Sequence, residues 1–263
     1  MENNRSRDTD LAADQKVVSL NDYVLNKYGI VIDKQAKILD FGCGSGRHTY
    51  EYLDAGYPNI VGFDARDYTQ LRDPSHRDRF RFLDIEKSYR IPFDDNLFDL
   101  VTSTSVFEHV INQPETISEI ARVLKPTGVT LHVFPSRWRP IEPHIFVPFS
   151  GAVQADWWLR LWARFGIRNE FQRDCSSRET AARNREYCAT GLSYRGFKEI
   201  DELWKRRFER VEYGEREFIE ATRKISKVSQ LVYPATKVVP GIINLYRFAH
   251  TRVVLAQLPR SAS

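Results

Sequence analysis

The chain has 263 residues, of which 42% are hydrophobic and 28% charged, and these values are typical of a folded globular protein. Its 39 basic residues are nearly balanced by 35 acidic ones, so the net charge of +4 does not indicate nucleic acid as a partner. Three cysteines, Cys43, Cys175 and Cys188, are too few for a disulfide framework and favour a reducing, cytoplasmic setting. No run of about 18 apolar residues predicts a membrane span. Residues 1–16 are polar, which predicts a mobile arm without a signal peptide.

Strand and helix patterns alternate from residue 17 to residue 135. Apolar residues at helical spacing cover residues 17–28, and from residue 36 on the chain has short apolar runs that are separated by turns. The predicted strands cover residues 36–42, 59–64, 79–85, 98–104 and 129–134, and the predicted helices cover residues 17–28, 47–55 and 114–126. Alternation at such short intervals predicts an α/β fold, a parallel sheet with helices on both faces.

The pattern changes after Pro135. Residues 136–195 are rich in tryptophan and arginine, and we interpret them as an insertion over the sheet. Within the insertion, residues 156–173 predict one helix. Four large apolar side chains share one face of that helix: Trp158, Leu161, Trp162 and Phe165. These side chains either cap the core or form a lid that stacks on a substrate.

Regular patterns return in the last part of the chain. A helix is expected over residues 196–208, a strand over 210–217, a helical stretch over 219–250 with breaks near Pro234 and Pro240, and a strand over 252–258. The apolar stretch around Pro234 carries lysines, so contact with a membrane surface or a second subunit is an alternative to core packing.

A glycine loop follows the first predicted strand, in "ILDFGCGSG". Gly42, Gly44 and Gly46 allow positive φ angles and a close approach of a ligand to the backbone. The dinucleotide fingerprint would need a glycine where Arg47 stands, and the lysine of a phosphate-binding P-loop is absent. The loop is therefore expected to hold a ligand other than a pyrophosphate.

Three acids accompany this loop. Asp40 precedes the glycines, Asp64 ends the second predicted strand, and Asp84 ends the third, with Ile85 beside it. Because the carboxyl ends of parallel strands meet at one edge of a sheet, these acids are expected to face one crevice. Asp40 suits a cationic ligand, Asp64 a ribose diol, and Asp84 an exocyclic amine, with Ile85 against a flat ring.

Together, "ILDFGCGSG", "VGFD", "FLDI", "FDLVTSTSVFEHV" and "EIARVLKPTGVTLHV" resemble a class I S-adenosylmethionine-dependent methyltransferase of the type 11-like subgroup. The resemblance is strong over residues 36–135 and weak over 196–258. It implies one methyltransferase domain over the chain, with a Rossmann-like sheet of seven strands, mostly parallel, and an antiparallel last strand. It also implies that S-adenosylmethionine is the cofactor, with the glycine loop against its amino-acid part. The implied cofactor-binding residues are Asp40, Gly42, Cys43, Gly44, Gly46, Asp64, Ala65, Asp84, Ile85, Ser103 and Thr104.

Two histidines are candidates for the base that an alcohol acceptor needs. His109 follows the fourth predicted strand in "SVFEHV", and the resembling family carries "EHV" there whatever the acceptor, so His109 alternatively shapes the cofactor pocket. His144 lies in "EPHIFVPF", which is similar to sequences of methyltransferases that modify sugars and polysaccharides.

Missing motifs narrow the chemistry. The fourth predicted strand runs into "TSTS", without the Pro-Pro turn that positions nucleobase amines, and no zinc spacing or second acid pair is present. We therefore expect metal-independent transfer of a methyl group to a hydroxyl of a sugar or polysaccharide-type small molecule. A lipid or quinone-like acceptor, and a non-catalytic protein that binds S-adenosylmethionine, are the alternatives.

Overall fold

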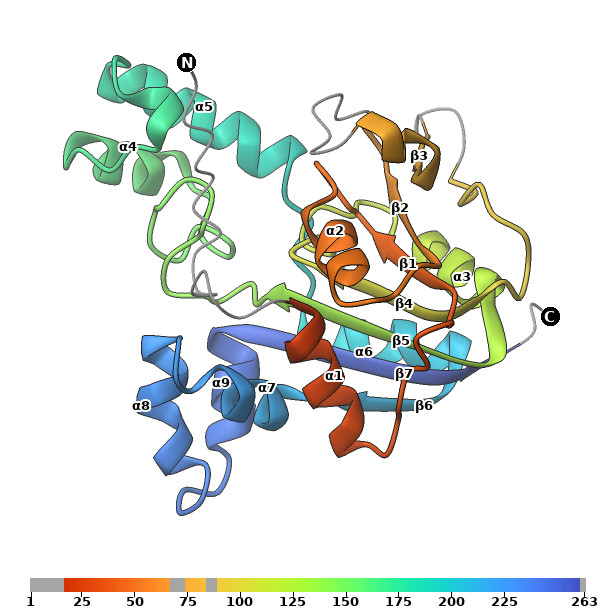
Figure 1. Ribbon diagram of the computed structural model, residues 1–263. Coiled ribbons are helices and arrows are strands. Elements are labelled where there is room, and N and C mark those ends of the chain that lie inside the picture. The colour runs from red at the N-terminus through yellow and green to blue at the C-terminus, as the bar shows by residue number, and fades with distance from the viewer. Residues whose placement is uncertain (1–16, 67–73, 84–88, 261–263) are drawn as a thin grey trace.

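The computed structural model describes residues 17–66, 74–83 and 89–260 (Figure 1). The described strands are β1 (Ile38–Phe41), β2 (Ile60–Asp64), β3 (Phe80–Phe82), β4 (Phe98–Thr104), β5 (Leu124–Pro135), β6 (Phe208–Tyr213) and β7 (Thr251–Pro259). The described α-helices are α1 (Val17–Lys27), α2 (Arg47–Asp54), α3 (Gln113–Val123), α4 (Asp156–Arg164), α5 (Ser177–Thr190), α6 (Phe197–Arg207), α7 (Glu215–Thr222), α8 (Lys227–Ala235) and α9 (Ile242–Ala249). The expected arm of residues 1–16 lies outside these ranges.

The strands form one seven-stranded sheet in the order β3-β2-β1-β4-β5-β7-β6. Neighbouring strands from β3 to β5 are parallel, whereas β7 runs antiparallel to both β5 and β6. This order confirms the predicted Rossmann-like sheet with an antiparallel last strand. Since β1, β2, β4 and β5 run the same way, the loops that follow them meet at one edge.

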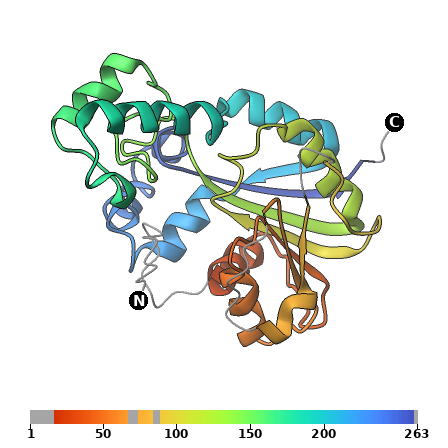
Figure 2. The same cartoon turned by 90° about the horizontal axis from the view of Figure 1, so that it is seen from above.

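Helices cover both faces of this sheet because successive strand residues point to opposite sides. Ile38 and Leu100 pack into a hydrophobic cluster with α1, α2 and α7. Their neighbours Leu39 and Val101 pack on the other face, in a cluster with α3 and α6. Figure 2 shows the sheet between these two layers.

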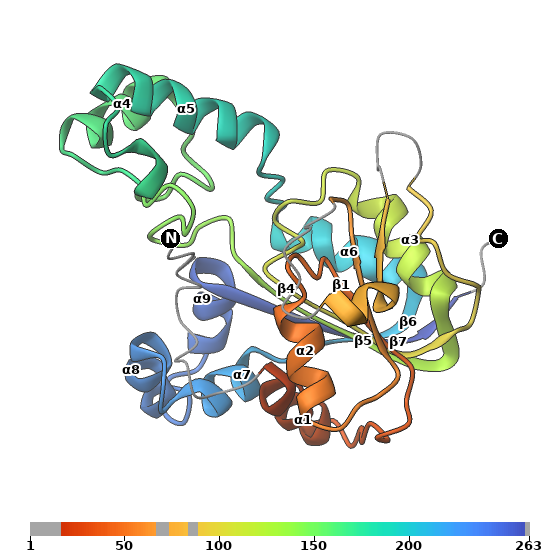
Figure 3. The same cartoon turned by 45° about the horizontal axis from the view of Figure 1, so that its top comes forward.

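The insertion begins where β5 ends, at the edge that carries the glycine loop. Figures 1 and 3 show α4 and α5 standing clear of the sheet. They have a hydrophobic cluster of their own, whose buried members include Leu159, Ala163 and Ala181. The insertion is therefore a second packed unit attached to the sheet by loops.

The predicted helix over residues 156–173 is wrong in length. Helix α4 ends at Arg164, because Gly166 adopts a left-handed φ of 85° and a short 3₁₀ turn, Glu170–Gln172, follows. Trp158 and Trp162 pack on the insertion's cluster, but Phe165 is 71% exposed. Helix α5 was not predicted.

The predicted helical stretch at 219–250 consists of three helices. Helix α7 already begins at Glu215, and Ser226 caps the start of α8 through a hydrogen bond from the Ser229 amide. Helix α8 ends at Ala235, one residue after Pro234, and α9 begins only after Pro240, so the expected breaks near both prolines are confirmed. No helix in the described ranges is long and apolar enough to cross a membrane.

Candidate active site

A cavity of about 550 Å³ opens at the edge of the sheet where the loops after β1, β2 and β4 meet. The sheet contributes Gly42, Gly44 and Asp64 to its wall, and the loop after β4 contributes His109. The insertion contributes Tyr187, Thr190 and Gly191. The cavity therefore lies between the two packed units.

The glycine loop has the backbone that its sequence predicts. Gly42, Gly44 and Gly46 all have positive φ, at 75°, 53° and 83°. A Cβ on Gly42 would lie 2.4 Å from Val106 Cγ2, whereas a Cβ on Gly44 would meet nothing within 4 Å. Gly42 is thus required by packing, while Gly44 leaves a bare stretch of backbone on the cavity.

Asp64 lies opposite this bare backbone. Its carboxylate accepts hydrogen bonds from the Gly44 amide at 2.8 Å and the Arg66 amide at 3.1 Å. Partial burial raises the pKa of Asp64, against the lowering effect of these amides. Asp64 and Ala65 both line the cavity, as the sequence predicts.

Asp40 and Cys43 are placed differently from the loop glycines. Asp40 is 1% exposed and accepts a hydrogen bond from the Thr49 hydroxyl at 2.7 Å, so its carboxylate lies behind the loop. Cys43 packs with Tyr50 and Phe80, and burial raises the pKa of its thiol. Neither side chain lines the cavity; both support the loop from beneath.

Neither of the two residues expected to bind the cofactor at the end of β4, Ser103 and Thr104, lines the cavity. Ser103 is buried, and its hydroxyl lies 2.6 Å from Nδ1 of His132 inside the core. Thr104 is not part of the cavity wall, which Ser105 and Val106 form instead. Asp84 and Ile85 lie outside the described residues, so their roles remain predictions.

The structure brings the two candidate histidines together, although α3, β5 and part of the insertion separate them along the chain. The rings of His109 and His144 lie 4.8 Å apart, centre to centre, in an edge-to-face arrangement. His109 Nδ1 is 2.6 Å from the carbonyl oxygen of Gly191. His144 Nδ1 is 2.7 Å from Glu142 Oε1.

Two buried glutamates beside these histidines were not among the predicted site residues. Glu142 also accepts hydrogen bonds from the backbone amides of His144 and Ile145. Burial acts to raise the pKa of Glu142, but the hydrogen bond and the charge of His144 outweigh it, so this pKa is lowered. Glu108 has a fully buried side chain, and burial raises its pKa to about 8. Burial lowers the pKa of His109. Burial also acts to lower the pKa of His144, but the hydrogen bond and the charge of Glu142 outweigh it, so the pKa of His144 is raised.

Comparison with known proteins places the first half of the chain beside one family. Residues 39–132 match the sequence model of a methyltransferase domain family. Within the sheet described above, residues 39–132 are thus similar to methyltransferase domains.

Relatives of this chain share only part of their length with it. An uncharacterized protein of Haemophilus influenzae is 31% identical over 107 residues, which cover 37% of this chain and 41% of that protein. Sterol 24-C-methyltransferase erg6 of Schizosaccharomyces pombe is 32% identical over 108 residues, covering 39% of this chain and 28% of the relative. The chain thus spans less than half the length of these relatives.

One solved structure resembles most of the chain. Phosphoethanolamine N-methyltransferase 2 of Haemonchus contortus, in complex with phosphomonomethylethanolamine and S-adenosylhomocysteine, superposes with a TM-score of 0.50 at 16% identity. The superposition covers 90% of this chain and 52% of that one. At this identity the likeness concerns the fold.

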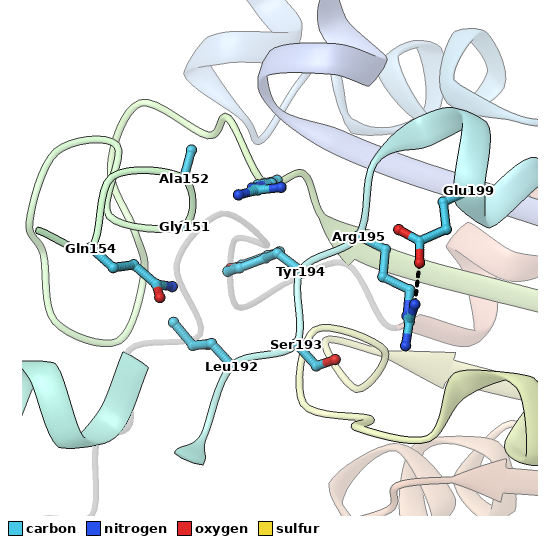
Figure 4. A pocket seen from close by; sticks show the side chains of 9 residues that line it. Gly151, Ala152, Gln154, Leu192, Ser193, Tyr194, Arg195 and Glu199 are labelled. Atoms are coloured by element: carbon cyan, nitrogen blue, oxygen red, sulfur yellow. Dashed lines mark hydrogen bonds and ion pairs between the residues drawn. The ribbon is translucent and has the colours of Figure 1, made fainter. Parts of the chain in front are cut away.

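A second hollow, of about 290 Å³, lies where the insertion joins the rest of the chain. Figure 4 shows Tyr194 pointing toward the loop with Gly151 and Ala152, while Arg195 turns the other way and pairs with Glu199. Since Gly191 lines the larger cavity and the next residues line this hollow, the same short segment borders both.

Proposed function

We propose that this protein transfers the methyl group of S-adenosylmethionine to a small-molecule acceptor. The similarity to methyltransferase domains and the fold likeness support this activity. The observation that carries it is the pairing of Gly44, whose open side faces the cavity, with the Asp64 carboxylate at 2.8 Å from its amide.

The residues of the cavity fit the chemistry of this cofactor. S-adenosylmethionine has a sulfonium cation and a ribose diol but no phosphate, so it calls for carboxylates and bare backbone and not for a lysine clamp. Asp64 would accept from the ribose hydroxyls, and the Gly42–Gly46 backbone would lie against the amino-acid part. Asp40 would set the local charge from beneath the loop, and Asp84 and Ile85 would meet the adenine.

We further propose that the acceptor is a hydroxyl of a sugar or polysaccharide-type molecule. A hydroxyl loses its proton on methylation, so it needs a group beside it that takes or weakens that proton. His109, which lines the cavity, provides such a group, and His144 lies beside it with the two ring centres 4.8 Å apart. Glu108, His109 and His144 are also residues that could bind a metal ion together. We therefore do not include metal independence, which the sequence predicts, in the proposed function.

A hydrophobic acceptor is the second candidate. The sterol methyltransferase relative acts, by its name, on a lipid. Helices α8 and α9 and the turn between them expose large apolar side chains, namely Leu231, Val238, Leu245 and Phe248. Sedimentation with anionic phospholipid vesicles, compared between the wild type and Leu245→Ser, would show whether this surface binds lipid.

Calorimetry with S-adenosylhomocysteine tests the cofactor site. Gly44→Ala places a methyl group where the cofactor is expected, and Gly29→Ala is its matched control, because both glycines have positive φ and open space around the added Cβ. We expect both variants to lose similar stability, about 1 kcal/mol, and only Gly44→Ala to lose binding. Equal affinity in the two variants would remove the proposed site.

Turnover distinguishes an enzyme from a binding protein. Release of S-adenosylhomocysteine during incubation with sugar or lipid acceptors is expected for the wild-type chain. Binding of the cofactor without release in the presence of any acceptor would favour the non-catalytic alternative.

A further inference from the structure

We infer that Glu108, His109 and His144 form a binding site for one first-row divalent cation beside the cavity that His109 lines. The three residues come from two parts of the chain. Glu108 and His109 follow β4, while His144 lies in the insertion. Each residue offers one ligand atom, and these atoms all lie within 4.8 Å of one another.

Both imidazoles are held in the orientation that metal ligands require. The Nδ1 of His109 lies 2.6 Å from a backbone carbonyl oxygen, that of Gly191. The Nδ1 of His144 lies 2.7 Å from the Glu142 carboxylate. A histidine that binds a metal through Nε2 almost always donates its other ring proton to a carbonyl or carboxylate, which fixes the tautomer and the ring. Here both outer partners are present, so both Nε2 atoms remain for a cation.

Glu108 supplies the second, independent observation. Its side chain is completely buried, and neither carboxylate oxygen has a hydrogen-bond partner among the described residues. A carboxylate so placed destabilises a protein unless something compensates for its lost hydration. His109 Nε2 is 4.0 Å from Glu108 Oε1, too far for a hydrogen bond. His144 and Arg139 also act on the Glu108 carboxylate through their charge. A cation between Glu108 and the imidazoles would provide the compensation.

The ligand set determines the class of cation. Two imidazole nitrogens and one carboxylate oxygen suit a first-row transition metal, and three protein ligands leave positions open. Metal–ligand distances of about 2.0–2.2 Å would bring the ligand atoms to about 3–3.5 Å from one another, an inward movement of about 1 Å. Because His109 lines the cavity, the open positions would face the acceptor space.

A cation here would also explain how the acceptor loses its proton. An alcohol oxygen bound to a divalent cation has a lowered pKa, so its proton could pass to solvent water while the imidazoles stay bound to the metal. The methyl group would then move from the sulfonium sulfur to that oxygen and leave S-adenosylhomocysteine. This consequence rests on the proposed function, whereas cation binding does not. The site would also fasten the insertion to the sheet, since the ligands come from both.

Direct titration tests the site. The full chain, freed of metals by a chelator, is titrated with Co²⁺ followed by visible absorption, and with Zn²⁺ by calorimetry, without cofactor or acceptor. We expect one cation per chain. Glu108→Gln and His144→Asn should each weaken affinity more than about 100-fold, and Glu142→Gln by about 10- to 100-fold, the usual cost of losing an outer partner. His250→Asn is the matched control, since His250 lies at the end of α9 with its Nδ1 2.8 Å from the Thr251 hydroxyl, and its affinity should equal that of the wild type.

Thermal unfolding gives an independent readout. Without metal, Glu108→Gln should unfold at no lower temperature than the wild type, because an amide of the same shape replaces a buried carboxyl group that makes no hydrogen bond. With Zn²⁺, only the wild type and His250→Asn should gain stability. Absence of a bound cation in the wild type, or wild-type affinity in both Glu108→Gln and His144→Asn, overturns the inference. A wild-type chain that binds the cation but does not bind S-adenosylhomocysteine would instead count against the proposed function and leave the cation site in place.

Discussion

The two walls of the cavity are built in different ways. The sheet wall includes a stretch of bare backbone: three glycines with positive φ follow a buried strand, and Val106, which also lines the cavity, leaves no room for a side chain at Gly42. The insertion wall consists of residues at the end of α5, namely Tyr187, Thr190 and Gly191, and the insertion's own small cluster supports this helix. A shared cofactor constrains backbone geometry, whereas an acceptor is selected by side chains that can vary without disturbing the sheet.

Gly42→Ala should cause the largest effect and would test how rigid the sheet wall is. The added Cβ would lie 2.4 Å from Val106 Cγ2, in a backbone conformation that alanine resists. We expect a loss of about 4 kcal/mol in the free energy of unfolding, measured with urea. Gly56→Ala, with a φ of 85° and open surroundings, should cost only about 1 kcal/mol. Addition of Val106→Ala to Gly42→Ala should recover part of the loss; no recovery would contradict the packing explanation.

Leu159→Ala should show whether the insertion is a separate unit. Leu159 is fully buried in the insertion's cluster, and its truncation should cost about 3 kcal/mol. Hydrogen exchange should quicken in α4 and α5 while β4 and β5 keep their protection. Leu161→Ala, on the same helix at 37% exposure, should change little. Equal loss of protection in the sheet would mean that the two units unfold together.

Acid should destabilise the sheet through His132 in β5. Burial lowers the pKa of this side chain to about 3, so between about pH 6.5 and 3 the unfolded chain binds a proton that the folded chain does not. Stability therefore falls as the pH falls through this window, by about 2 kcal/mol between pH 7 and 5.

Urea unfolding of the wild type and His132→Gln at several pH values checks this contribution. The variant should lose packing at every pH but lack this part of the pH dependence. Parallel curves for the two proteins would show that His132 is not the group responsible.

Trp158→Phe should have the smallest effect. The indole Nε1–H of Trp158 donates to the Pro148 carbonyl at 2.7 Å, which joins α4 to the loop before it. Loss of this hydrogen bond should cost about 1 kcal/mol, measured by thermal unfolding. Trp157→Phe is the control, because Trp157 is 63% exposed. Equal shifts in both variants would assign the effect to general ring packing.

The sequence predicted the sheet well because its signals are local. The buried run at residues 38–41 is followed by Gly42, and the run at residues 60–64 ends in Asp64, so these strand ends are marked directly. Helix α5 was missed although Ser176 and Glu179 form a capping box at its start, because its apolar residues have little helical spacing. The helix at 156–173 was predicted too long because the pattern of aromatic residues continues past Gly166.

The site was predicted unevenly for a related reason. Asp64 and the glycines follow from their positions at strand ends. The burial of Asp40 depends on Thr49 in the next helix, and the cluster around Glu108 depends on how the insertion folds back onto the loop after β4. Such contacts between distant segments leave no pattern in a single sequence. The "EHV" motif did mark His109, but its glutamate was overlooked.

The place of β7 has a consequence for synthesis of the protein. This strand enters between β5 and β6, so the central ladder that joins Leu131 to Leu255 closes across more than a hundred residues of chain. During translation the edge of β5 stays unpaired until residues 251–259 have left the ribosome, and an unpaired strand edge is prone to pair with other chains. Chaperone dependence of the nascent protein should therefore end at the moment this strand is released.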